Sequence, residues 1–323
     1  MNIGVIGVGA IGGWLAARLA LGGHQVTCLA RGNTLEALKA GLVVEECGQL
    51  ERVFPDVSAL AQGERELVVI ASKAMALAGA AEVARPWIGP DTLLLPLHNG
   101  VPWWFVDGAP LQSVDPGGRI AAAIPFEQVI GGVVHASCWR RTPNHVVVAH
   151  ADRLLIGKPD GGADGRVAQL AELLRSAGVP AEASETVRRD IWYKLWGNMT
   201  INPLSALTRA TADRLVGDQA LKPFILAAMA EAAAVGAAIG CPIAESGEKR
   251  MAVTARLGSF KTSMLQDLEA GRPLEFEALV GAPREIGRRV GIPTPNIDTL
   301  YAMIRLLDGA GRQSPETKLL SYS

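Results

Sequence analysis

Three polar side chains recur at steps of four within an apolar stretch. Lys194, Asn198 and Asn202 interrupt "YKLWGNMTINPLSAL" (193–207), and Pro203 follows directly. Because successive helical residues rotate by about 100°, these three side chains share one face of a helix. Burial lowers the pKa of an ammonium group, which suits an acid working near neutral pH, and amides bind polar ligands. The stripe predicts either a ligand site or a row of hydrogen bonds between domains.

A glycine-rich loop near the start of the chain has the spacing of a dinucleotide-binding fingerprint. Gly7, Gly9 and Gly12 follow the apolar run "NIGVIG" (2–7) and open a helical pattern over 11–24. Gly7 would allow the tight turn, Gly9 would let the backbone approach a pyrophosphate, and Gly12 would let the helix pack on the sheet. The N–H groups that open the helix, including those of Ala10 and Ile11, would bind the phosphates. Glycines that serve only a turn are the alternative.

The end of the next expected strand, "QVTCLA" (25–30), distinguishes between cofactors. An NAD site usually has an acidic residue there for the ribose 2′-hydroxyl, but no Asp or Glu occurs from His24 to Asn33. Arg31 stands at that position, and a guanidinium suits a 2′-phosphate, so we expect NADP(H). Lys73, after the run "ELVVIAS" (66–72), is a second candidate for phosphate or ribose. The alternatives are an arginine and a lysine that face water.

The composition excludes several classes of protein. The chain has 323 residues, of which 49% are hydrophobic, and a net charge of −1, so nothing indicates a nucleic-acid partner. The apolar stretch 224–240 is interrupted by Glu231 and is better explained as a buried helix than as a membrane span. We therefore expect a cytoplasmic protein with reduced thiols and no metal site. The cysteines are far apart in the sequence: Cys28, Cys47, Cys138 and Cys241.

The first third of the chain alternates between strand and helix patterns. Near-continuous apolar runs at 2–7, 25–30, 66–72 and 92–98 predict strands that are covered on both faces. Helical patterns lie between them, at 11–24, 33–41 and in "AMALAGAAEVARPWI". This alternation predicts an α/β fold, a Rossmann-type doubly wound parallel sheet.

The pattern changes twice after the first third. Residues from about 118 to 160 are strand-rich, a helix is expected at 166–178, and the rest is almost entirely helical: 186–200, 219–239, 246–270, 275–290 and 295–308. We therefore expect an NADP-binding domain over 1–184 and a helical substrate and catalytic domain over 185–323. Pro203 lacks the N–H of a regular helix, so we expect a break or kink at Asn202. The apolar helix near 219–240 would pair in a homodimer or lie in a monomer's core.

Two further stretches complete a recognisable pattern. Asn99 lies in "LPLHNGV" (95–101), and "TSMLQDLEAGRPLEFEALVG" (262–281) carries Ser263 and Glu275. With them, nearly the whole chain resembles the ketopantoate reductase (2-dehydropantoate 2-reductase) family. The resemblance rests on "GVGAIGG", "SKA", "NGV", the pattern K-x-x-x-N-x-x-x-N-P at 194–203, and "SMLQDLEAGRPLEFEALVG". It implies a Rossmann domain, an all-helical domain, a cleft between them, and reduction of 2-dehydropantoate to pantoate by NADPH, in pantothenate biosynthesis.

The resemblance also implies roles for single residues. Lys194 resembles the general acid that protonates the carbonyl oxygen, and Glu275 the carboxylate that binds the substrate's hydroxyl group. Arg31 and Lys73 match contacts to the 2′-phosphate, and Asn99 also lies beside the cofactor. The substrate-binding amides and hydroxyl match four residues: Asn99, Asn198, Asn202 and Ser263.

The chain departs from the family pattern next to Asn99. His98 stands where a glutamine is expected, and Trp103 and Trp104 begin what looks like an insertion running to about residue 120. These tryptophans would either cover the substrate and change specificity or pack within a long loop. A relative that reduces another 2-oxo acid, or that works in the oxidative direction, is therefore an alternative. A non-catalytic NADP-binding sensor is a further alternative, although a sensor would not need both Lys194 and Glu275.

Overall fold

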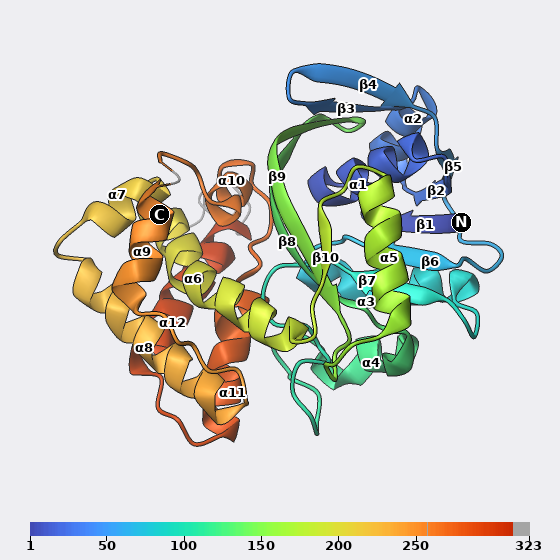
Figure 1. The fold of residues 1–323 in the computed structure, drawn as a ribbon. Coiled ribbons are helices and arrows are strands. Elements are labelled where there is room, and N and C mark those ends of the chain that lie inside the picture. Colours follow the sequence, from blue (N-terminus) through green and yellow to red (C-terminus); the bar gives the residue numbers. More distant parts are fainter. Residues whose placement is uncertain (257, 313–323) are drawn as a thin grey trace, which may run out of the picture. The chain divides into compact units, whose positions relative to one another are not determined.

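The computed structural model describes residues 1–256 and 258–312 (Figure 1). The chain forms two compact units. The first comprises Met1–Pro110 and Asp115–Ile191, and the second comprises Leu111–Val114 and the described residues from Trp192 onward. The boundary between residues 184 and 185 stays a prediction, and the short segment 111–114 was not expected in the second unit.

The first unit is built on a five-stranded parallel sheet in the order β5-β2-β1-β6-β7. This order confirms the predicted α/β doubly wound fold, because the chain runs outward from β1 on one side through β2 and on the other through β6. The carboxyl ends of β1 and β6 therefore form the switch point where such sheets bind ligands. The strands are β1 (Asn2–Ile6), β2 (Gln25–Leu29), β5 (Asp56–Ser58), β6 (Leu67–Ile70) and β7 (Leu93–Pro96).

The helices of the first unit lie where the apolar periodicity predicts them, except the short helix 119–123, which falls in a stretch predicted to be strand-rich. They are α1 (Ala10–Leu21), α2 (Gly32–Lys39), α3 (Leu77–Ala84), α4 (Arg119–Ala123) and α5 (Gly165–Ser176). Short 3₁₀ turns add η1 (Ala74–Ala76), η2 (Arg85–Trp87), η3 (Pro116–Gly118) and η4 (Phe126–Gln128). The single helix expected in "AMALAGAAEVARPWI" is thus η1, α3 and η2 in succession.

A second sheet of the first unit has the order β10-β9-β3-β4, with β8 paired to β9. Its strands are β3 (Leu42–Glu46), β4 (Gln49–Val53), β8 (Gly131–Thr142), β9 (His145–Gly157) and β10 (Ala181–Ala183). Helix α1 contacts strands of both sheets, and Gly13 permits this because a Cβ there would lie 2.7 Å from the Val146 side chain. The hairpin of β3 and β4 was not predicted. It turns at Cys47 and Gly48, whose φ angles are 51° and 76°.

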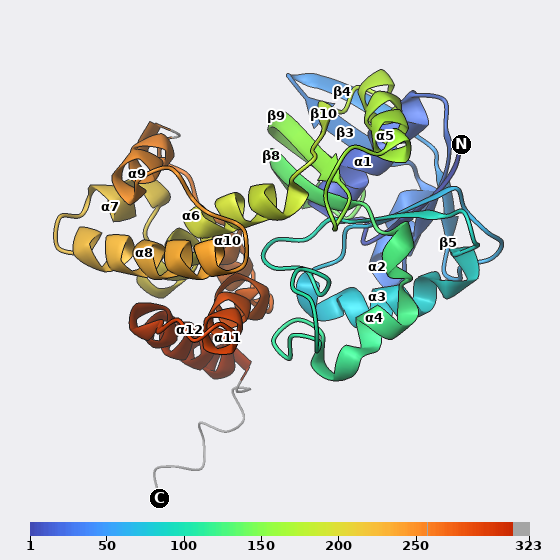
Figure 2. The ribbon, with the colours of Figure 1, turned by 60° about the horizontal axis from the view of Figure 1, so that its bottom comes forward.

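The second unit is helical, as predicted, and Figure 2 shows α8, α11 and α12 packed together within it. Its elements are α6 (Val187–Thr208) from Trp192, α7 (Ala212–Gly217), α8 (Lys222–Ala238), α9 (Gly247–Arg256), α10 (Ser263–Glu269), the π-helical turn η5 (Glu277–Gly281), α11 (Ala282–Arg289) and α12 (Pro295–Arg312). The apolar helix α8 buries Ile225, Met229 and Val235 in the core of this unit. No helix of the described residues is long and apolar enough to cross a membrane.

Three helix predictions in this unit need correction. The expected helix 246–270 is two helices, because α9 ends at Arg256 and α10 begins at Ser263. The expected helix 275–290 starts with the π-helical turn. Of the break or kink expected at Asn202, a break is wrong, since α6 continues through Pro203 to Thr208, and a kink stays a prediction. Proline removes one backbone hydrogen bond there, and burial of Ile201 and Leu204 on either side stabilises the continuous helix.

Candidate functional site

The predicted cofactor residues of the first unit lie at one edge of the parallel sheet. The glycine loop follows β1, Arg31 follows β2, Lys73 follows β6 and Asn99 follows β7. These four strands are neighbours in the order β2-β1-β6-β7, and their parallel pairing places all four carboxyl ends together. The sheet thus brings together the residues that the sequence predicted for the dinucleotide.

The three glycines of the loop differ in what surrounds them. Gly7 has a φ of 82°, and a Cβ there would lie 2.5 Å from the Ser72 nitrogen. A Cβ on Gly12 would collide with the carbonyl oxygen of Gly7. A Cβ on Gly9 would meet only that same oxygen, at 3.8 Å. Gly7 and Gly12 are therefore needed for packing, whereas Gly9 borders space that a ligand's phosphates could occupy.

The start of α1 provides hydrogen-bond donors for such a ligand. No side chain caps this helix, and its first turn contains no acidic residue. The N–H groups of Ala10, Ile11 and Gly12 open the helix, where backbone donors have no partner within the helix and an anion is favoured. A pyrophosphate fits both this donor set and the open space at Gly9.

Ser72 is a residue of this edge that the sequence reasoning missed. Its Oγ is buried and has no hydrogen-bond partner among the described residues. A buried hydroxyl without a partner is costly, so this atom suits a ligand group. Its position just before Lys73 in "ASKAM" was the available signal.

The remaining residues of the edge differ in exposure. Arg31 is exposed at the N-cap of α2, where its guanidinium could meet a 2′-phosphate, and Lys73 and Asn99 are half-buried.

The two tryptophans of the predicted insertion are both buried. A Cβ on Gly131 would lie 2.8 Å from the Trp104 ring, and the Trp103 ring lies 6.4 Å from the His98 ring at 24°. Trp104 therefore packs against β8, and Trp103 stacks on the residue before Asn99.

The predicted stripe of the second unit lies on α6, opposite two anchors. The indole N–H groups of Trp192 and Trp196 donate to carbonyl oxygens of α8, at 3.2 and 2.8 Å. The helical rotation places Lys194 and Asn198 on the other side of α6. Both are half-buried, and Asn202 is buried. The face of α6 that carries Trp192 and Trp196 is therefore anchored on α8, and Lys194 and Asn198 point away from α8.

Lys194 has the strongest electrostatic signature of the predicted residues. Burial lowers the pKa of Lys194 to about 8, and the nearby Glu275 carboxylate raises it, so burial dominates. An ammonium with this pKa is mostly protonated at neutral pH and releases its proton readily. Lys194 and Glu275, 81 residues apart in sequence, therefore act on each other electrostatically.

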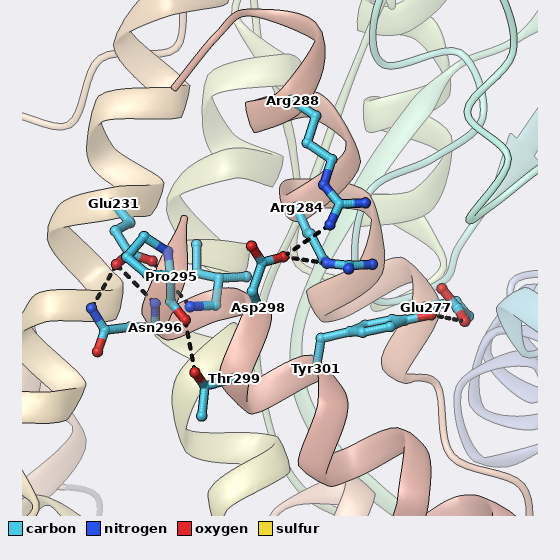
Figure 3. A network of polar contacts seen from close by, with 10 residues as sticks. Glu231, Glu277, Arg284, Arg288, Pro295, Asn296, Asp298, Thr299 and Tyr301 are labelled. Atoms are coloured by element: carbon cyan, nitrogen blue, oxygen red, sulfur yellow. Dashed lines mark hydrogen bonds and ion pairs between the residues drawn. The ribbon is translucent and has the colours of Figure 1, made fainter. Parts of the chain in front are cut away.

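Glu275 is half-buried in the segment between α10 and the π-helical turn η5. Before it, the Arg272 Nε donates to Asp267 at 2.8 Å and closes the turn after α10. Ser263 is exposed at the first position of α10, which Thr262 caps by accepting a hydrogen bond from the Leu265 N–H at 3.2 Å. Figure 3 shows the polar network beyond Glu275, in which Tyr301 reaches Glu277. The sequence reasoning missed this network, which joins residues far apart in the chain.

Charge and oxygen ligands do not gather into a metal site. No group of three or more His, Cys, Asp or Glu side chains suited to a metal ion occurs within residues 1–256 and 258–312. The second unit contains the Lys194 ammonium and the Glu275 carboxylate, which interact electrostatically.

Comparisons with known proteins cover almost the whole chain. The family model described as "Ketopantoate reductase PanE/ApbA" matches residues 3–161, and its C-terminal counterpart matches residues 186–308. A 2-dehydropantoate 2-reductase of Mesorhizobium japonicum is 39% identical over 95% of this chain and 98% of its own length.

Solved structures agree. The crystal structure of a candidate ketopantoate reductase from Ralstonia solanacearum MolK2 matches this chain with a TM-score of 0.92 and 50% sequence identity. The match covers 96% of this chain and 98% of the Ralstonia chain. The crystal structure of 2-dehydropantoate 2-reductase from Methylococcus capsulatus matches with a TM-score of 0.84 and 30% sequence identity. This match covers 98% of this chain and 99% of the Methylococcus chain.

Proposed function

Because the chain belongs to the ketopantoate reductase family, we propose that it reduces 2-dehydropantoate to pantoate with NADPH. The observation that carries this proposal is Lys194, a half-buried ammonium whose pKa desolvation lowers to about 8 and which interacts with Glu275. A reductase of 2-oxo acids needs such a proton donor, whereas a cofactor sensor does not.

The proposed chemistry divides between cofactor and protein. Bound NADPH supplies the hydride for the carbonyl carbon. The Lys194 ammonium donates a hydrogen bond to the carbonyl oxygen, where negative charge develops, and then transfers a proton to it. Glu275 favours the charged form of Lys194 and accepts a hydrogen bond from the substrate's hydroxyl group. Hydride on carbon and proton on oxygen together give the 2-hydroxy acid.

The amides and the serine hydroxyl have positioning roles in this proposal. Asn198 and Asn202 extend along α6 from Lys194, and Ser263 opens α10. With Asn99 they would hold the substrate's carboxylate and carbonyl groups through hydrogen bonds.

NADP(H) is the proposed cofactor. The Gly7–Gly12 loop and the start of α1 would hold the pyrophosphate, and Ser72 would give its unpartnered hydroxyl to the same ligand. Arg31 would bind the 2′-phosphate, with Lys73 beside it. No carboxylate that would repel this phosphate occurs between His24 and Asn33.

A spectrophotometric screen of NADPH oxidation tests the function. Purified protein is assayed with ketopantoate and with a panel of branched and aromatic 2-oxo acids, and NADPH affinity is measured separately. We expect the highest kcat/KM for ketopantoate. A higher value for another 2-oxo acid would assign the chain to a relative with that substrate. Tight NADPH binding without turnover on any acid would indicate the sensor instead.

We also propose a homodimer and a cytoplasmic location. The outer face of α12 exposes Met303 and Leu306, with 39% and 67% of their surface accessible. A ketopantoate reductase of Staphylococcus aureus is described as dimeric. Light scattering after size-exclusion chromatography tests the dimer, and charged substitution of Leu306 should weaken it.

A further inference from the structure

Helix α12 holds the chain on the N-terminal side of Glu275. The carboxylate of Asp308 accepts a hydrogen bond from the Leu274 N–H at 3.0 Å, and Leu274 is the residue directly before Glu275. Leu274 is itself buried. The backbone at this point is therefore fixed both by packing and by a charge-assisted hydrogen bond.

The same helix holds the C-terminal side of Glu275. The Tyr301 hydroxyl donates to Glu277 at 2.9 Å (Figure 3). The Tyr301 ring also lies 5.7 Å from the ring of Phe276. Glu277 opens the π-helical turn, and a Cβ on Gly281 would collide with the Glu277 carboxylate. The turn thus brings Glu277 back over Gly281 and toward Tyr301. Such π-helical turns are frequent at functional sites.

The two contacts come from one face of α12. Tyr301 and Asp308 are seven residues apart, which on an α-helix is about two turns and nearly the same direction. Helix α12 is fixed in turn to α11 and α8. Arg284 lies 4.5 Å from the centre of the Tyr301 ring and pairs with Asp298, and Glu231 accepts hydrogen bonds from Asn296 (Figure 3).

We propose that α12 positions Glu275 and that Tyr301 and Asp308 are the positioning residues. The inference rests on the proposed function, which gives Glu275 its role beside Lys194. A carboxylate that acts on a substrate must be held to within about 0.5 Å, and a residue in a loop needs outside support for that. Here the support reaches Leu274, Phe276 and Glu277, the residues around Glu275.

Burial and the mutual hydrogen bond set the titration of Glu277 and Tyr301. Burial raises the pKa of Glu277, and the hydrogen bond from Tyr301 opposes this. Burial and the Glu277 contact raise the pKa of Tyr301, so the phenol keeps the proton that it donates. The charged groups that also act on Glu277 are Arg284, Glu285 and Arg305.

Single-atom and single-group substitutions on α12 test the proposal. Tyr301→Phe removes one hydroxyl and keeps the ring, and Asp308→Ala removes the acceptor for the Leu274 N–H. Asp308→Asn keeps an acceptor oxygen and serves as the conservative rescue. Thr299→Val is the matched control, because it deletes a hydroxyl of the same helix whose hydrogen bond, to the Pro295 carbonyl at 2.8 Å, stays within α12 (Figure 3).

We expect Tyr301→Phe and Asp308→Ala to lower kcat with 2-dehydropantoate by about tenfold, because a small misplacement of a catalytic group has a large effect on rate. NADPH affinity should stay within about twofold in every variant, since the cofactor edge is in the other unit. Asp308→Asn and Thr299→Val should both resemble the unsubstituted protein. A misplaced Glu275 supports the charged form of Lys194 less well. The basic limb of the pH profile should therefore move to lower pH in the two disruptive variants.

A second readout does not depend on turnover. The neutral amine of Lys194 reacts with acetic anhydride, so mass spectrometry of its acetylation rate against pH reports its titration. Tyr301→Phe and Asp308→Ala should shift this titration to lower pH. An unchanged titration and kcat, with only a lower melting temperature, would overturn the positioning role, as would an equal loss in Thr299→Val. If the unsubstituted protein reduced no 2-oxo acid, the proposed function would fail, and the Lys194 titration alone would decide this inference.

Discussion

At Lys194, two opposing effects on the pKa combine to make a useful acid. Burial disfavours the ammonium, and the Glu275 carboxylate favours it, with a resulting pKa of about 8. An exposed lysine would hold its proton too tightly near neutral pH, and a buried lysine without a carboxylate would lose it. The sequence pattern predicts Lys194 as a candidate acid. Its pKa, however, depends on Glu275, which is 81 residues away in the sequence.

Removal of Lys194 tests its role as proton donor. Lys194→Ala should lower kcat by about 10²- to 10⁴-fold, the usual contribution of general acid catalysis, and leave the Kd for NADPH unchanged. Stopped-flow kinetics and fluorescence titration of NADPH measure the two quantities. Lys249→Ala, at an exposed lysine of α9, is the control. Unchanged turnover in Lys194→Ala would remove this lysine from the mechanism.

The pKa of Lys194 also predicts a pH profile. The acid must be protonated before hydride transfer, so kcat/KM should be high below pH 8 and fall as the pH rises through about 8. Glu275→Gln removes the charge that raises this pKa, so its basic limb should lie at lower pH. Initial rates across a constant-ionic-strength buffer series measure both profiles. A limb that did not move in Glu275→Gln would contradict the electrostatic coupling.

Arg31 determines the cofactor preference in our proposal. Arg31→Ala should raise the KM for NADPH by about tenfold or more, because a charge-assisted contact to the 2′-phosphate is lost. The KM for NADH should change little, since NADH lacks this phosphate. Steady-state assays with both cofactors measure the ratio, and equal effects on the two would count against the phosphate contact.

At the scale of elements, the apolar patterns of the sequence predicted the strands and helices that are regular and buried. The parallel strands and the helices between them follow from continuous apolar runs and helical periodicity. The β3 and β4 hairpin was missed because "QLERV" is largely exposed and has no apolar run. The π-helical turn was missed because it has the same local composition as an α-helix. Its first residue, Glu277, accepts a hydrogen bond from Tyr301, which is 24 positions away and not visible to a local pattern.

Two glycines of the turn between β1 and α1 have different expected roles, Gly12 in packing and Gly9 in cofactor binding. Gly12→Ala should destabilise the fold, because its Cβ would collide with the Gly7 carbonyl oxygen. Gly9→Ala should fold normally, since its Cβ meets only one atom at 3.8 Å, but should bind NADPH at least about tenfold more weakly. Thermal unfolding and NADPH titration of the pair separate the two effects. Normal NADPH affinity in Gly9→Ala would mean that this space is not used by the cofactor.

At the scale of the whole molecule, the two structural units do not correspond to two continuous parts of the sequence. The motifs predict cofactor residues in the first part of the chain and a catalytic stripe in the helical part, and these residues lie in separate units of the structure. The segment Leu111–Val114 belongs to the helical unit although it lies within the first part of the sequence. Its assignment depends on contacts with residues about 170 positions away, which no local pattern reveals.

Glu285 of α11 fixes this segment, and its loss should be measurable. Its carboxylate accepts hydrogen bonds from the Gln112 N–H at 2.9 Å and from the Ser113 N–H and hydroxyl at 2.9 and 2.8 Å. Glu285→Ala should lower the free energy of unfolding by about 1–2 kcal/mol, because these donors lose a charged acceptor. Urea denaturation measures this change.

A matched control is Glu82→Ala, which removes an exposed ion pair with Arg119 and should cost little. Burial raises the pKa of Glu285, but the hydrogen bonds from Ser113, Gln112 and Arg289 outweigh it and leave the pKa lowered. The contribution of Glu285 is therefore present above the ordinary pKa of a glutamate and lost as the pH falls through the lowered value. An equal effect of both substitutions at neutral pH would contradict the role of Glu285.

The attachment of Leu111–Val114 to α11 constrains which chimeras of this chain would keep the helical unit intact. A crossover near residue 192 would join the loop of one parent to the helices of another, although loop and helix form one structural unit. Glu285 accepts from the main-chain N–H of Gln112, so the side chain at position 112 takes no part in this contact. The length of the loop is not free, because an insertion or deletion would move those donors out of reach. Chimeras that exchange the helical part should therefore carry this loop with it.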